Sequence, residues 1–127
     1  MNPLTLEWVQ KAEADFEAAQ VLSQSATPLH DAVCFHAQQC IEKYLKAWLQ
    51  EANVRFPRSH DLEEMLDLII PTIPAWNAWR SDFVVLTTHA VEFRYPGKSA
   101  NAADAQNATR VCLNVRTIIR PSLGFSV

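Results

Sequence analysis

The stretch PLHDAVCFHAQQCIEKYLKAWLQEA, residues Pro28–Ala52, decides the fold class. Apolar side chains recur in it at steps of three and four residues, the spacing that puts them on one face of an α-helix. A helix that is apolar over a wide arc is expected at the centre of a bundle. Thr27 is predicted to cap this helix, and Pro28 suits its first position. The apolar face comprises Val33, Ala37, Cys40, Ile41, Tyr44, Leu45, Trp48 and Leu49.

Four further segments have helical periodicity. The first follows Asn2, which can cap it, and has an apolar stripe of Val9, Ala12, Phe16 and Ala19. The predicted segments are Pro3–Ser23, about Ser59 to the residue before Pro71, about Pro74–Phe93, and about Asn101–Arg120, with a loose tail over Ser122–Val127. Since the connections between them are short, consecutive helices should pack antiparallel. The sequence therefore predicts one all-α domain over residues 1–127, an antiparallel up-and-down bundle of four to five helices.

The fourth and fifth predicted segments differ in their apolar residues. In the fourth, Val84, Val85 and Val91 are β-branched, so a strand is the alternative; its length and its aromatic spacing favour a helix. The fifth has an apolar face of Ala105, Ala108, Val111, Cys112, Val115, Ile118 and Ile119.

Composition restricts the class of protein. Of the 127 residues, 49% are hydrophobic, which argues against disorder, and only two are glycine, which argues against an all-β fold and a glycine-rich phosphate loop. The formal net charge of −3 means that any RNA contact must use a local basic patch. Cys34, Cys40 and Cys112 form no CxxC motif, and no apolar run approaches the ~18 residues that cross a membrane. We expect a soluble cytoplasmic protein.

The central helix also has a polar strip opposite its apolar face. A helix turns by about 100° per residue, which aligns the strip residues His36, Gln39, Lys43, Lys46 and Gln50, with Glu42 at one edge. The strip could face a ligand or a partner chain; the alternative is a solvated face on which Glu42 pairs with Lys46. His36 and Cys40 also have a spacing that can share a metal ion, but a zinc site needs three or four ligands, so no metal site is predicted.

Several stretches together resemble the HEPN domain family. They are KAEADFEAAQVL (residues 11–22), CFHAQQCIEKYLKAWL (34–49), SHDLEEML (59–66) and FRYPG (93–97), in the family's order and spacing. The resemblance implies a helical bundle that dimerises. It also implies a link to nucleotides or RNA and a minimal nucleotidyltransferase as partner in a two-component, toxin–antitoxin-like system. No cofactor is implied.

Some members of that family are metal-independent ribonuclease toxins, in which an Arg is followed by four to six residues and a His on a late helix. Imidazole can move protons near neutral pH, and guanidinium can hold a phosphate. Here only Arg55 and His60 have this spacing, but Pro57 interrupts them and they precede the third helix. We therefore predict a non-catalytic binding subunit and no catalytic residue. A ribonuclease that uses another site, with His60 or His36, and a structural dimer or adaptor remain as alternatives.

Arg94 and Tyr95 lie where the chain leaves the fourth segment, before Pro96. The residue before a proline prefers extended backbone, so a rigid corner could present Arg94 to a phosphate and Tyr95 to a base. The alternative is that Arg94 caps helix carbonyls and Tyr95 packs on the bundle. The predicted ligand-binding residues are His36, Gln39, Lys43, His60, Arg94 and Tyr95, and the predicted partners are a second copy of the chain, a nucleotidyltransferase, and a nucleotide or RNA.

Overall fold

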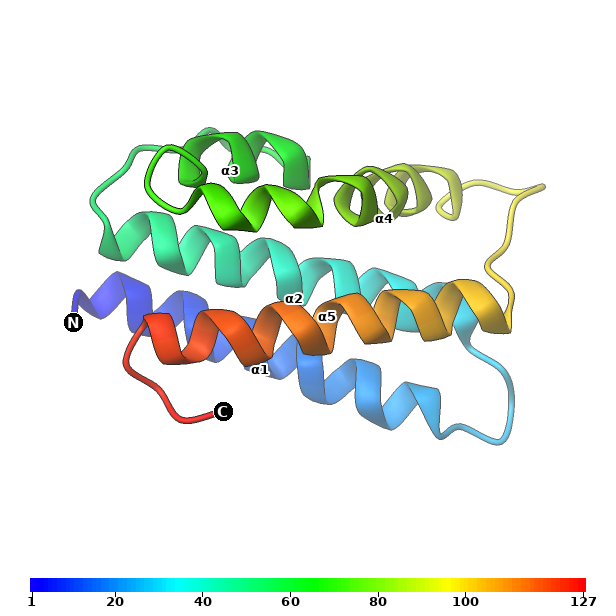
Figure 1. Cartoon of the computed structure of the whole chain (residues 1–127). Helices are drawn as coiled ribbons and strands as arrows, with labels where there is room; N and C mark the ends of the chain where they lie inside the picture. Colours follow the sequence, from blue (N-terminus) through cyan, green and yellow to red (C-terminus); the bar gives the residue numbers. More distant parts are fainter.

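The computed structural model describes residues 1–127, and all of its regular structure is helical. The helices are α1 (Pro3–Ser23), α2 (His30–Glu51), α3 (Leu62–Ile69), the 3₁₀ helix η1 (Pro74–Trp79), α4 (Arg80–Glu92) and α5 (Ala102–Ser122). In Figure 1, α1, α2, α4 and α5 run alternately along the long axis of the molecule, and α3 is a short helix beside α4. The predicted all-α bundle is confirmed. None of the helices combines the length and the apolar character that crossing a membrane requires.

Helix α2 lies at the centre and contacts α1, α3, α4 and α5. The apolar face predicted from its periodicity is buried, and Ile41, Tyr44 and Leu45 have no exposed surface. The same hydrophobic cluster includes side chains from every other helix. Because α2 supplies one continuous apolar face to four neighbours, it positions the polar residues at its two edges as well.

The starts of α1 and α5 follow from local sequence. The side chain of Asn2 accepts a hydrogen bond from the backbone N–H of Leu4 at 2.9 Å, and Pro3 occupies the first helical position. At α5, the Asn101 side chain accepts from the backbone N–H of Asp104, whose carboxylate accepts from the N–H of Asn101. This capping box satisfies two backbone donors that have no partner inside the helix.

Two predicted helix starts were wrong by a few residues. Helix α2 begins at His30, after Leu29, and Thr27 does not cap it. Helix α3 begins at Leu62 rather than near Ser59, because Asp61 is its cap and accepts from the N–H of Glu63. The Ser59 hydroxyl accepts from the N–H of Asp61, so short polar side chains bond to nearby backbone here in place of a helical turn.

The fourth predicted helix is two elements, the 3₁₀ helix η1 and then α4. The helix at Val84, Val85 and Val91 is confirmed, and these three side chains are exposed. Pro71 and Pro74, which lack backbone donors, lie between α3 and the first turn of η1 and separate these two elements.

The C-terminal predictions were wrong in two respects. Helix α5 passes through Pro121 to Ser122, and the tail is packed: Leu123 is buried, and Arg120 donates from Nε to the carbonyl of Ser126. The Arg120 guanidinium also lies over the ring of Phe125. Ile118 does not belong to the buried face, because its side chain is 40% exposed.

Candidate phosphate-binding site

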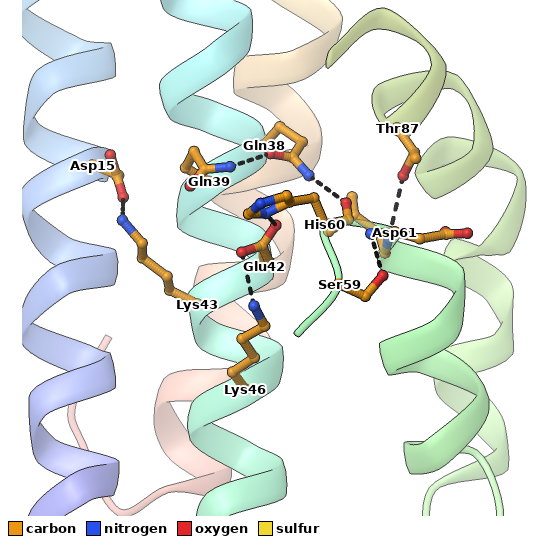
Figure 2. A network of polar contacts seen from close by, with 11 residues as sticks. Asp15, Gln38, Gln39, Glu42, Lys43, Lys46, Ser59, His60, Asp61 and Thr87 are labelled. Carbon is orange, nitrogen blue, oxygen red and sulfur yellow. Dashed lines mark hydrogen bonds and ion pairs between the residues drawn. The ribbon is translucent and has the colours of Figure 1, made fainter. Parts of the chain in front are cut away.

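Asp15 of α1 holds two of the predicted residues of α2. Its Oδ1 lies 2.9 Å from Nδ1 of His36, and its Oδ2 accepts a hydrogen bond from Nζ of Lys43. Asp15 is buried between the two helices, whereas His36 and Lys43 are partly exposed. One carboxylate therefore fixes both an imidazole and an ammonium group at the α1–α2 seam, as Figure 2 shows for Lys43.

The edge of α2 that faces α3 is also an ordered network rather than a solvated face (Figure 2). Glu42 is 2% exposed; its Oε2 accepts from Nζ of Lys46 at 3.0 Å, and its Oε1 lies 3.0 Å from Nδ1 of His60. Lys46 is also buried, with its ammonium group 5.5 Å from the ring centroid of Trp8. The pairing of Glu42 with Lys46 is as predicted. The interpretation of a solvated face is wrong at Glu42 and Lys46, because α1 and the segment before α3 cover these two residues.

Gln39 and His60 are joined through a residue that the sequence interpretation did not select. Gln38 is buried; its Nε2 donates to the carbonyl of His60 at 3.0 Å, and its Oε1 accepts from Nε2 of Gln39. Figure 2 shows this chain running from α2 to the residues before α3. Gln39 and His60 therefore belong to a connection that holds the α2–α3 segment on α2.

A pocket of about 230 Å³ lies between the start of α2 and the end of α4. Two histidines and an arginine contribute to it: His36 from α2, His89 from the last turn of α4, and Arg94 from the turn that follows α4. The remaining lining residues are Asp31, Ala32, Cys34, Phe35, Ala90 and Phe93. We call it the α2–α4 pocket. It brings together two of the predicted ligand-binding residues, His36 and Arg94, which are 58 residues apart in the sequence.

Arg94 has no acidic partner within the chain, since none of the ten ion pairs includes it. Its backbone N–H donates to the carbonyl of Val91 at 3.4 Å, and that of Tyr95 to the carbonyl of Glu92 at 3.3 Å. The chain thus continues α4 as a turn at these residues, and the predicted extended corner is wrong at Arg94. Tyr95 is 63% exposed and does not line the α2–α4 pocket.

The sequence interpretation missed Asp15 and His89. Asp15 is three residues after Ala12 and four before Ala19, so it lies on the apolar stripe of α1. An acid on a buried stripe indicates a buried partner, and that signal was available. No arginine precedes His89 at the ribonuclease spacing, so that motif does not select it. Its Nδ1 is buried without a hydrogen-bond partner, and its ring packs on Phe93 with centroids 4.7 Å apart.

Arg55 and His60 do not form a motif in space. Arg55 is exposed beyond the end of α2, and the ring of His60 turns to Glu42. Cys40 is fully buried, whereas His36 turns to Asp15, so these two do not converge. No group of three or more His, Cys, Asp or Glu side chains is arranged to hold a metal ion.

A separate ionic cluster joins α1, α2 and α5. The Glu13 carboxylate accepts two hydrogen bonds from Arg116, at 2.7 and 2.8 Å, and one from the hydroxyl of Tyr44. The Arg116 guanidinium is the main cause that lowers the pKa of Glu13. Burial is the main cause that raises the pKa of Tyr44, and the hydrogen bond to Glu13 adds to it. Arg120 also donates to the Tyr44 hydroxyl, so each charged group of this cluster has a partner within it.

Comparison with known proteins gives one family. No curated protein and no solved structure matches the chain. The family model described as HEPN domain matches residues 5–123, which is nearly the whole chain and includes all the helices except the first two residues of α1. The family links this bundle to nucleotide-binding and ribonuclease-like proteins. The chain belongs to the HEPN domain family.

Proposed function

We propose that this HEPN protein is a non-catalytic subunit that binds a phosphate group of a nucleotide or of RNA in the α2–α4 pocket. The observation that carries the proposal is that Arg94, an arginine with no internal acidic partner, shares this pocket with His36, whose ring is fixed by Asp15. A guanidinium group can bind phosphate through two parallel hydrogen bonds. The protonated form of His36, whose Nδ1–H donates to Asp15, adds a third donor at Nε2.

The other groups of the pocket support this ligand class. Asp31 is the one acid that lines it, and its Oδ1 already accepts from the backbone N–H of Ala100 at 2.6 Å. Phe35 and Phe93 offer apolar surface for a sugar or a base. Lys43 contributes indirectly, because it neutralises Asp15, whose charge would otherwise repel a phosphate near His36. Gln39, His60 and Tyr95 lie outside the pocket, and their part in binding stays a prediction.

The test is a titration of the protein with fluorescent ATP and with labelled single-stranded RNA, followed by anisotropy at low and physiological salt. Arg94→Ala should weaken binding about tenfold or more, the loss typical of one charge-assisted pair. Lys43→Ala should weaken it less. The matched control is Lys98→Ala, which removes an exposed cation that does not line the pocket. Equal losses in Arg94→Ala and Lys98→Ala would contradict the proposal.

We also propose that a minimal nucleotidyltransferase is the protein partner, in a toxin–antitoxin-like pair in the cytoplasm. The support is the family and the lack of the ribonuclease motif on a late helix. Co-expression of the two proteins, with only one tagged, should yield a complex of fixed stoichiometry in gel filtration. Recovery of the tagged chain alone would contradict this part.

A homodimer belongs to the same proposal. Its support is the apolar surface of α4, where Val84, Val85 and Val91 are exposed. Light scattering should give twice the mass of one chain, and Val84→Lys with Val91→Lys should give the mass of a single chain. The structural dimer or adaptor alternative predicts the same dimer but no phosphate binding.

A metal-independent ribonuclease is the second candidate, because His36 and His89 line the same pocket as Arg94. Two imidazoles can act as general base and general acid in phosphodiester transesterification. Cleavage of RNA in the presence of EDTA, lost in both His36→Ala and His89→Ala, would establish it. Intact RNA after prolonged incubation with the wild-type protein would leave the binding subunit as the function.

A further inference from the structure

The cations of the chain fall into two groups. Seven of the eleven Lys and Arg side chains form ion pairs with Asp or Glu: Lys43, Lys46, Arg80, Lys98, Arg110, Arg116 and Arg120. The four that do not are Lys11, Arg55, Arg58 and Arg94. Three of the seven arginines therefore have no acidic partner, although the chain has an excess of acids. Arg94 belongs to the α2–α4 pocket, so three unpaired cations lie elsewhere.

These three cations lie at the end of the bundle where α2 finishes. Gln50, in the last turn of α2, lines one shallow hollow with Lys11, Trp8 and the acid Glu7, and a second with Arg55 and Phe56. Arg58 is three residues further along the same connection and is exposed. Figure 1 shows that this connection and the start of α1 occupy the same end of the molecule. Lys11, Arg55 and Arg58 with the two aromatic residues therefore form a surface, which we call the α2–α3 basic surface.

The backbone that carries the two arginines is held at both ends. Asn53 adopts a left-handed conformation (φ 58°) that turns the chain out of α2, and the N–H of Val54 donates to the carbonyl of Leu49. At the other end, Gln38 donates to the carbonyl of His60, and the His60 ring contacts Glu42 (Figure 2). The buried network thus fixes the segment that displays Arg55 and Arg58, which lowers the entropy lost when they bind a ligand.

Aromatic side chains support the middle of this segment. Phe56 packs against Trp8 of α1, with ring centroids 6.1 Å apart and planes at 66°. Both rings are partly exposed. Cations interleaved with partly exposed aromatic rings are the composition of surfaces that bind single-stranded nucleic acid, in which phosphates meet cations and bases contact rings.

We infer that the α2–α3 basic surface binds the phosphate backbone of single-stranded RNA, as a second contact for the RNA that the proposed function brings to the α2–α4 pocket. The inference rests on the proposed function, because it takes RNA to be the ligand of the α2–α4 pocket. His36 and Gln50 are fourteen residues apart on α2, so the two sites are separated by ~21 Å along the helix. A mononucleotide cannot reach both sites, whereas a strand of several nucleotides can.

The experiment compares labelled oligouridine with fluorescent ATP over a range of salt concentrations. The test variant is Arg55→Gln with Arg58→Gln, and the control is Lys98→Gln with Arg110→Gln, which removes the same charge from ion-paired positions. Because all four side chains are largely exposed, circular dichroism and the melting temperature should match the wild type. The test variant should bind oligouridine about tenfold more weakly at low salt, and its salt slope should fall by ~1.4, the value for two contacts on a single strand.

ATP binding separates this inference from the proposed function. The test variant should keep the ATP affinity of the wild type, and Arg94→Gln should lose it. Loss of RNA binding in Arg94→Gln alone, with the test variant equal to the control, would overturn the inference and leave the proposed function intact. Loss of RNA binding in the test variant alone would support the α2–α3 basic surface and would contradict phosphate binding in the α2–α4 pocket. A poly-glutamate peptide that displaces oligouridine at equal charge concentration would overturn RNA as the ligand in favour of an acidic protein.

Discussion

Oδ1 of Asp15 lies 2.9 Å from Nδ1 of His36, across the seam between α1 and α2. The same carboxylate accepts a hydrogen bond from Lys43, so a single buried acid organises two side chains that the sequence places on a polar strip. Because Nδ1 faces Asp15, the opposite ring nitrogen, Nε2, is the one available to a ligand.

Replacing Asp15 by Asn should destabilise the bundle. The amide keeps the size of the side chain but removes the negative charge that compensates Lys43, and charge-assisted hydrogen bonds contribute about 2 kcal/mol. Urea unfolding should show this loss as a lower midpoint with an unchanged slope. Glu17→Gln on the exposed side of α1 is the control and should change the free energy of unfolding by less than about 0.5 kcal/mol. A similar value for Asp15→Asn would contradict the role given to this carboxylate.

Replacing Lys46 by Met should cost about 3 kcal/mol, because it removes the lysine that compensates the buried carboxylate of Glu42 and leaves the His60 ring as its only side-chain partner. The double variant Glu42→Gln with Lys46→Met should recover part of that loss, since no uncompensated charge stays buried. A double-mutant cycle of unfolding free energies measures the coupling. Additive effects of the two substitutions would show that the pair does not interact in solution.

The stability of the protein should depend on pH through Glu13. Its pKa in the folded state is lowered, chiefly by the Arg116 hydrogen bonds, whereas in the unfolded chain it takes the ordinary value of about 4.3. The unfolded state therefore binds a proton at higher pH, so the contribution is complete above about pH 5 and is lost as pH falls through the folded pKa. The difference in unfolding free energy between wild type and Glu13→Gln should be largest at pH 7 and should shrink below about pH 4. Glu64→Gln, an exposed and unpaired acid, should show no such trend.

Cys34, which lines the α2–α4 pocket, should be unreactive in the native protein. Burial, with Asp104 and Asp31 adding to it, raises its pKa to about 11, so little thiolate exists near neutral pH. Iodoacetamide should modify Cys34 far more slowly in the native protein than in urea, with the rates read by mass spectrometry. Equal rates in the two conditions would mean that the pocket opens readily.

The sequence is enough to predict which segments are helical, though not every boundary, because apolar stripes and caps are local features. Asn2 with Pro3 and Asn101 with Asp104 mark the starts of α1 and α5. The error at Glu42 and Lys46 has a different origin. A helical wheel separates polar from apolar residues, but it cannot show that Trp8 and His60 come from elsewhere to cover the polar edge.

The same reason limits prediction of the pocket. His36 and Arg94 could be selected individually from residue type and resemblance, but their meeting depends on α4 ending beside the start of α2. His89 could not be selected, because its only distinction is a buried Nδ1 without a partner. Asp15 could have been found, since it interrupts an apolar stripe.

The central place of α2 also determines how the bundle opens. Each of α1, α3, α4 and α5 packs on α2, so the loss of any one of them leaves α2 still covered by the rest. Amide hydrogens of Ile41, Tyr44 and Leu45, whose side chains are fully buried, should therefore exchange with solvent only when the whole bundle unfolds. Amides at the end of α4, beside the pocket, can exchange through local opening, so a ligand in the pocket should slow exchange there and leave the α2 amides at the rate set by global unfolding.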